Sequence, residues 1–144
     1  MDQQVNEALR LLFAHDSFLL EADVAERSIA EKLARYLAPQ FPNHHVDVEY
    51  NRHGVDPKRI TLPAGFRGGI SKLFVPDIVV HQRGHDDKNL LAIQLKKETN
   101  RDPRAYDQAI IDAMKHEYRY GRGLLIDLPA GPGAKDRKAR LEWR

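Results

Sequence analysis

Val75-Pro76-Asp77-Ile78-Val79-Val80-His81, followed after a polar segment by Leu90-Leu91-Ala92-Ile93-Gln94-Leu95-Lys96-Lys97, is the stretch that decides the fold. Both runs are short, rich in β-branched or aliphatic residues and bounded by turn formers, which predicts a hairpin with its bend in residues 84–89. We expect Asp77 to pair near Lys96, beside Gln94, because side chains alternate along strands. Polar, ionisable groups in apolar strands are costly to bury unless they are paired or hold a cation, so this trio indicates a site.

The trio resembles the signature of the PD-(D/E)XK nuclease superfamily, in which an Asp at a strand start precedes an (Asp/Glu)-x-Lys triplet on the adjoining strand. Pro76-Asp77 and Lys96 match, whereas Gln94 stands where the family usually has an acid. The resemblance implies a restriction-endonuclease-like fold with an αβββαβ core. It also implies hydrolysis of phosphodiester bonds, with DNA as the favoured substrate and Mg²⁺ or Mn²⁺ as the cofactor.

The resemblance implies roles for individual residues as well. The catalytic set is Asp77, Gln94, Lys96 and Glu26. Asp77 is the central metal ligand, and the Gln94 amide oxygen, the Leu95 backbone carbonyl and Glu26 are the further ligands. Lys96 orients the nucleophile or stabilises the charge that develops on the phosphate.

Glu26 lies on a predicted helix over residues 22–37, where a helical wheel places it on the same apolar stripe as Ile29 and Leu33. A carboxylate on a core-facing stripe either reaches out to solvent, pairs with a buried lysine or belongs to a site. Relatives in the superfamily often carry a metal-associated Glu on this helix, so the resemblance favours the site. Glu49 is a weaker candidate, because the face it occupies depends on an unknown register.

Gln94 departs from the family pattern in charge. An amide keeps an oxygen ligand but lacks the negative charge, so we expect weaker metal affinity with the geometry preserved. Three explanations compete: a natural variant that restores charge through Glu26 or Glu49, an engineered inactive form, or a domain that kept the fold and lost cleavage. The alternative function is therefore a catalytically inactive nucleic-acid-binding or assembly module on the same scaffold. A cross-strand salt bridge between Asp77 and Lys96 is the plain structural alternative.

The predicted elements make one α/β domain, residues 1–144, with a mixed sheet flanked by helices. It comprises an N-terminal helix at about 3–14, a core at about 22–128 and a C-terminal basic extension at about 129–144. Apolar periodicity and turn signals predict a further helix over 103–118 and strands over 46–50, 59–62, 124–128 and 140–143.

Composition narrows the function classes. With 144 residues, 42% hydrophobic and 31% charged, the chain is long enough for one globular core. No apolar run approaches the roughly 18 residues of a membrane span, and no leader pattern is visible, so we expect a cytoplasmic protein without a membrane partner. The absence of cysteine excludes disulfides and thiolate metal sites, and the histidine spacing disfavours zinc. Homodimer formation stays open.

Positive charge is concentrated just before the hairpin. Residues 32–76 carry seven bases and three acids, whereas residues 1–31 carry two bases and seven acids. Basic residues interleaved with aromatic residues and glycines are typical of contacts with a phosphate backbone, although a solvated loop has a similar composition. The predicted nucleic-acid contacts are Arg52, Lys58, Arg59, Arg67 and Lys72.

Overall fold

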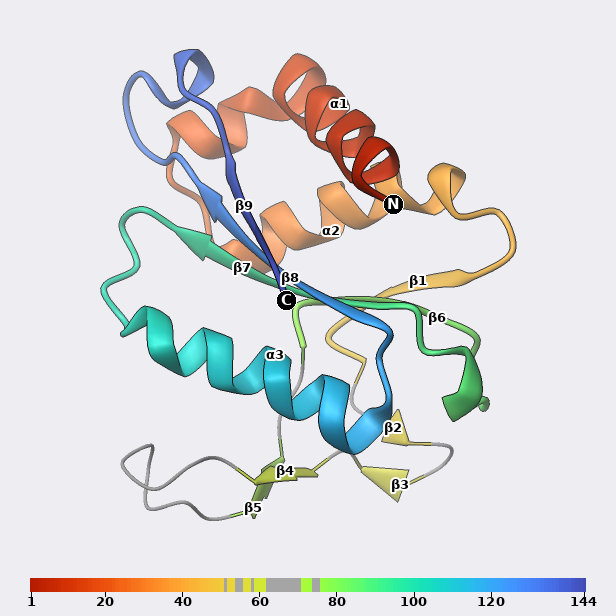
Figure 1. The fold of residues 1–144 in the computed structure, drawn as a ribbon. Helices are drawn as coiled ribbons and strands as arrows, with labels where there is room; N and C mark the ends of the chain where they lie inside the picture. The colour runs from red at the N-terminus through yellow and green to blue at the C-terminus, as the bar shows by residue number, and fades with distance from the viewer. Residues whose placement is uncertain (51, 54–55, 58, 62–70, 74–75) are drawn as a thin grey trace.

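The computed structural model describes residues 1–50, 52–53, 56–57, 59–61, 71–73 and 76–144, and it has an α/β architecture (Figure 1). A five-stranded mixed sheet lies between two layers of helix, with α1 and α2 on one face and α3 on the other. In this described part of the chain, no helix combines the length and apolar character needed to cross a membrane.

The elements follow one another as helix, helix, strands, helix, strands. The helices are α1 (Asp2–Glu21), α2 (Glu26–Leu37) and α3 (Arg104–Tyr118), and the sheet strands are β1 (His45–Val48), β6 (Ile78–His81), β7 (Leu91–Lys97), β8 (Arg122–Leu128) and β9 (Arg140–Trp143). Two small hairpins, β2 (Arg52–His53) with β3 (Asp56–Pro57) and β4 (Arg59–Thr61) with β5 (Ser71–Leu73), complete the described strands. Short 3-10 turns are η1 (Ala38–Gln40), η3 (Asp86–Lys88) and η4 (Ala134–Asp136).

The sheet has the order β1-β6-β7-β8-β9. β6 pairs antiparallel with both β1 and β7, β7 and β8 are parallel, and β9 returns antiparallel to β8. Helix α3 connects the parallel pair, as a parallel connection requires. The central strands are buried on both faces, which explains why residues 78–80 of β6 and 123–126 of β8 are continuous apolar runs instead of alternating ones.

Each sheet face has its own core. Ile78, Val80, Ile93 and Leu95 pack with the apolar stripes of α1 and α2. On the opposite face, Val79, Ala92 and Leu125 pack against α3 through Ile110, Ile111 and Met114. Alternation along the strands therefore assigns each side chain of β6 and β7 to a known face.

A glycine sets the approach of α3 to the sheet. A Cβ atom placed on Gly123 would lie 2.1 Å from Cγ2 of Ile111, closer than two carbon atoms can pack. Residue 123 of β8 thus needs to be glycine for α3 to lie at its observed depth.

The boundaries of the first two helices differ from the prediction. α1 continues beyond residue 14 to Glu21, with a non-helical backbone at Asp16, whose carboxylate accepts a hydrogen bond from the Tyr36 hydroxyl. The helix predicted from residue 22 begins only at Glu26. Asp23 has a φ of +51°, and its Oδ1 accepts a hydrogen bond of 2.8 Å from Lys97, so a tertiary contact holds the break between the helices.

The predicted hairpin is confirmed, but its register differs. Ile78 pairs with Ile93, so the next position along the strand places Asp77 opposite Gln94 and not near Lys96. The chain reverses direction at residues 82–85, earlier than predicted, where Gln82 forms a β-bridge with His85. The turn η3 then adds residues between this bridge and β7 with no counterpart on the β6 side. The faces of the three side chains are unaffected, because the shift is of an even number of residues.

The segment predicted as a C-terminal extension contributes η4 and β9 to the domain. Glu142 of β9 accepts hydrogen bonds from Arg104 at 2.6 and 2.9 Å, and the Arg104 interaction lowers the pKa of Glu142 to about 2. Arg104 also contacts both carboxylate oxygens of Asp127 on β8. These ion pairs connect α3 to the edge of the sheet.

Candidate active site

The three residues of the predicted motif lie on the same face of the sheet. Asp77 is two residues from Val79, and Gln94 and Lys96 are two and four residues from Ala92. Because side chains two or four residues apart share a face of a strand, all three lie on the α3 side with Val79 and Ala92. They occupy the end of the sheet where β6 begins and β7 ends, which α3 also reaches with its first turn. The structure therefore places Asp77, Gln94 and Lys96 around one corner between the sheet and α3.

Asp77 is held by the backbone of the neighbouring strand. Its Oδ2 accepts a 2.7 Å hydrogen bond from the Leu95 backbone N–H. The N–H and C=O of one strand residue point to the same side, so the Leu95 carbonyl also points toward Asp77. The Leu95 carbonyl oxygen thus faces the side of β7 on which Asp77 lies.

Burial and negative neighbours raise the pKa of Asp77 to about 7. Desolvation is the largest cause, and the Leu95 hydrogen bond opposes it. The charges of Glu26, Asp107 and Glu49 each raise the pKa further. A carboxyl group that titrates near neutrality beside other carboxylates is a typical functional-site feature, because a bound cation would stabilise its charged form.

Lys96 is fixed by the first turn of α3 and the loop before it. Its Nζ donates a 3.1 Å hydrogen bond to Oδ2 of Asp107 and a 2.5 Å bond to the Asp102 carbonyl oxygen. Both side chains of the Lys96–Asp107 pair are largely buried, 15% and 11% exposed. Burial raises the pKa of Asp107, and its hydrogen bond to Lys96 opposes that effect.

Gln94 also lies near the Asp107 carboxylate. Its polar side chain helps to lower the pKa of that carboxyl group. The amide oxygen of Gln94, Oε1, is buried and has no hydrogen-bond partner among the described residues. Leaving a buried carbonyl oxygen unpaired costs about 1–3 kcal/mol, which favours a ligand at this atom.

Glu26 approaches from the other helix layer. It is the first residue of α2, partly buried, and its Oε1 accepts a 2.7 Å hydrogen bond from the Asn100 side chain. Its effect on the Asp77 pKa shows that it lies within electrostatic range of that carboxyl group. Glu49 also acts on Asp77, and its carboxylate lies 3.4 Å from the Arg27 guanidinium.

Sequence reasoning missed Asp107 and Asn100. Asp107 precedes Ile110, Ile111 and Met114 by three, four and seven residues, so it lies on the buried stripe of α3, and this spacing was the available signal. A buried aspartate on such a stripe requires a partner, and Lys96 supplies it. Asn100 follows β7 in a turn and carried no comparable signal.

A hard cation at Asp77 would have to be bound by a mixture of carboxylate, amide and backbone oxygens. Within the described ranges, no three His, Asp or Glu side chains come close enough together to hold a metal ion. The oxygens that fit are one Asp77 carboxylate oxygen, the unpartnered Gln94 Oε1 and the Leu95 carbonyl. Mg²⁺ commonly binds with one or two carboxylates and keeps several waters, which agrees with so small a set.

The predicted nucleic-acid contacts fall on the least described part of the chain. Lys58 and Arg67 lie outside the described residues. Arg52, Arg59 and Lys72 belong to β2, β4 and β5, for which the structure describes the backbone alone. Of these strands, β4 contacts α3, the helix that supplies Asp107 (Figure 1).

Comparisons with protein families, curated proteins and solved structures give no significant match. The assignment of function therefore depends on the geometry described above.

Proposed function

We propose that this chain is a divalent-metal-dependent nuclease that hydrolyses phosphodiester bonds, with DNA as the favoured substrate. The observation that carries the proposal is the meeting of Asp77, the unpartnered Gln94 Oε1 and Lys96 at one corner of the sheet. The order α2, β1, β6, β7, α3, β8 supports it, because it follows the αβββαβ order of the PD-(D/E)XK superfamily. The parallel β7–β8 pair with α3 as its connection agrees with that order too.

Each residue has a defined chemical task in this proposal. Asp77, Gln94 and the Leu95 carbonyl would hold Mg²⁺ or Mn²⁺, with Glu26 as an additional carboxylate. The cation would neutralise charge on the phosphate and lower the pKa of the attacking water. Lys96 places an ammonium group beside these oxygens, where it stabilises the negative charge that develops on the phosphate.

Asp107 acts as a positioning residue. It orients Lys96 through a hydrogen bond and also lies near the Gln94 amide. Its negative charge lies near Asp77 and partly compensates for the charge that a glutamine at position 94 lacks. A site with Gln94 therefore keeps two further carboxylates, Glu26 and Asp107, within electrostatic range of the central ligand.

The inactive nucleic-acid-binding module is the second candidate, and the engagement of two site residues favours it. Glu26 is already hydrogen-bonded to Asn100, and Lys96 is hydrogen-bonded to Asp107 and Asp102. These contacts engage two of the three donors of the Lys96 ammonium group and one of the two Glu26 carboxylate oxygens, so fewer groups are left for substrate or metal.

Nicking of supercoiled plasmid in Mg²⁺ and in Mn²⁺ tests the two candidates. A nuclease would cleave with either ion, lose cleavage in EDTA and lose it in Asp77→Ala and in Lys96→Gln. Lys88→Gln is the matched control, because Lys88 is an exposed lysine on the hairpin turn. Retained DNA binding with no cleavage by the wild type in either ion would support the inactive module.

A further inference from the structure

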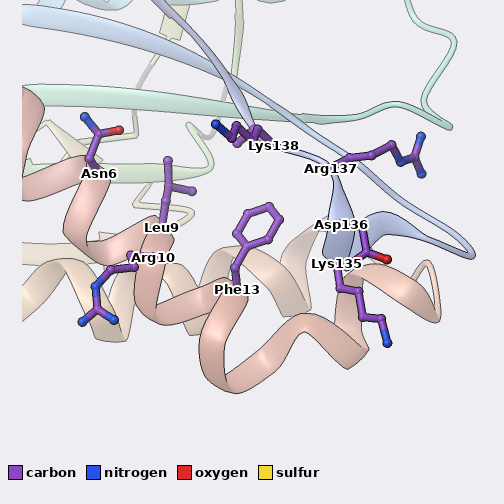
Figure 2. A pocket seen from close by; sticks show the side chains of 9 residues that line it. Asn6, Leu9, Arg10, Phe13, Lys135, Asp136, Arg137 and Lys138 are labelled. Atoms are coloured by element: carbon purple, nitrogen blue, oxygen red, sulfur yellow. The ribbon is translucent and has the colours of Figure 1, made fainter.

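A groove of about 550 Å³ lies between α1 and the segment 135–139, which leads from η4 into β9 (Figure 2). The floor of the groove is a single stripe of α1 with helical spacing: Asn6, Leu9, Arg10 and Phe13. Figure 2 shows Leu9 and Phe13 pointing toward the segment 135–139, whereas Arg10 points away. The groove therefore has an apolar floor, on the α1 side of the sheet.

Unpaired positive charge borders this floor. Arg10 is paired with Glu7, and Arg137 with Glu98. Lys135 and Lys138 are exposed and form no side-chain ion pair with a described residue, although the Glu21 carboxylate lies beside Lys135 and accepts a hydrogen bond from its backbone N–H at 2.9 Å. One acidic residue, Asp136, lines the same wall.

The groove ends where an open strand edge begins. β9 follows Ala139 directly and is the last strand in the sheet order, with β8 as its partner among the described strands. Gly123 and Arg144 exchange both backbone hydrogen bonds at 2.9 Å. Because bonding alternates along an antiparallel pair, the N–H and C=O groups of Leu141 and Trp143 point outward from the sheet. An exposed edge of this kind is a template for an added strand.

We infer that the groove and the β9 edge together bind an extended segment of a protein partner in which every second residue faces the groove and these residues are aliphatic and acidic in turn. The main chain of the segment pairs with the outward groups of β9. Its aliphatic side chains lie on Leu9 and Phe13, and its acidic side chains face Lys135 and Lys138. The inference is independent of the nuclease proposal, whose site lies on the α3 side of the sheet.

Nucleic acid fits this surface less well. A phosphate chain would lie across an apolar floor and close to the carboxylate of Asp136. Two unpaired lysines offer few phosphate contacts, whereas they match two acidic side chains of a short peptide.

The test uses the full chain and a fluorescein-labelled peptide of about eight residues, in which leucine and glutamate take turns at every second position and serine occupies the positions between them. We expect saturable binding by anisotropy and a change in the emission of Trp143, the one tryptophan of the sequence. Lys135→Glu/Lys138→Glu should weaken binding by at least about tenfold. The matched control, Arg35→Glu/Lys88→Glu, changes charge equally at exposed positions elsewhere and should alter binding by less than about twofold. Hydrogen exchange should slow at Leu141 and Trp143.

Several results would overturn the inference. They are no binding of the glutamate peptide, equal binding of a peptide with lysine in place of each glutamate, and unchanged affinity in Lys135→Glu/Lys138→Glu. Competition by a labelled oligonucleotide for the same lysines would assign the surface to nucleic acid. A dimer in sedimentation velocity that Lys135→Glu/Lys138→Glu dissociates would assign it to a second copy of the chain.

Discussion

Nζ of Lys96 lies 3.1 Å from Oδ2 of Asp107, so the lysine of the candidate motif is fixed by a helix that follows it in the chain. Asp107→Ala would leave Lys96 largely buried without its carboxylate, and we expect a loss of about 3 kcal/mol in the free energy of unfolding, measured with urea. Asp112→Ala on the same helix removes an exposed partner of Arg144 and should cost less than about 1 kcal/mol. Equal losses in the two variants would show that the Lys96–Asp107 pair is not a special contact.

Gln94→Glu tests whether position 94 limits metal binding. The new carboxylate would lie beside Asp77 and Asp107, so we expect lower thermal stability without metal and a larger stabilisation by Mn²⁺ than in the wild type. If the nuclease proposal holds, plasmid cleavage in Mn²⁺ should also rise. The double variant Asp77→Ala/Gln94→Glu is the control and should show neither gain. Negligible Mn²⁺ binding by both the wild type and Gln94→Glu in calorimetry would favour the inactive module.

The local patterns of the sequence predicted most of the sheet. The hairpin, the helix over 103–118 and the strand over 124–128 are confirmed, since each depends on apolar periodicity and on turn formers nearby in the chain. The break between α1 and α2 was not predictable in this way. It depends on Lys97, which contacts Asp23 across more than seventy residues of sequence.

In the candidate site, too, some features follow from local sequence patterns and others depend on tertiary packing. Strand alternation sufficed to place Asp77, Gln94 and Lys96 on one face, even with the register predicted wrongly. The role of Asp107 was not predictable, because its contact with Lys96 depends on how α3 packs on the sheet. The unpartnered Gln94 Oε1 is likewise a property of the packed structure and of no local pattern.

Gly123→Ala tests the packing that positions α3. Because the new methyl group would lie 2.1 Å from Cγ2 of Ile111, the Ile111 side chain or the helix that carries it must shift, and we expect a destabilisation of about 1–3 kcal/mol. In an Ile111→Ala background the same change should cost less, since the clashing atom is gone. A double-mutant cycle by urea unfolding measures this coupling, and purely additive effects would contradict the proposed contact.

The raised pKa of Asp77 makes metal-free stability depend on pH. The carboxyl group keeps its proton to about pH 7 when folded, but it loses the proton near its ordinary value of 3.8 when unfolded. The folded state thus binds more protons between these values, so its stability falls as pH rises toward 7 and then levels off, by at most about 1.4 kcal/mol per pH unit. In Asp77→Asn this contribution disappears. Urea unfolding at pH 5 and pH 8 should show a smaller decrease for Asp77→Asn, and equal decreases would contradict the assigned pKa.

Arg59 and Arg67 test the predicted substrate surface. β4, which contains Arg59, contacts α3, so phosphate contacts from Arg59 would hold a nucleic acid on the α3 side of the sheet, where Asp77 lies. Binding should weaken with salt because each neutralised phosphate releases counterions. Replacing Arg59 and Arg67 by alanine should reduce the slope of log affinity against log salt by about two, if both contact phosphate. Anisotropy with labelled duplex and single strands measures the slope, and Arg35→Ala/Lys88→Ala, with two exposed bases elsewhere, should leave it unchanged. An unchanged slope in the Arg59 and Arg67 variant would remove this segment from the binding surface, and the corner around Asp77 would then need a different route for its substrate.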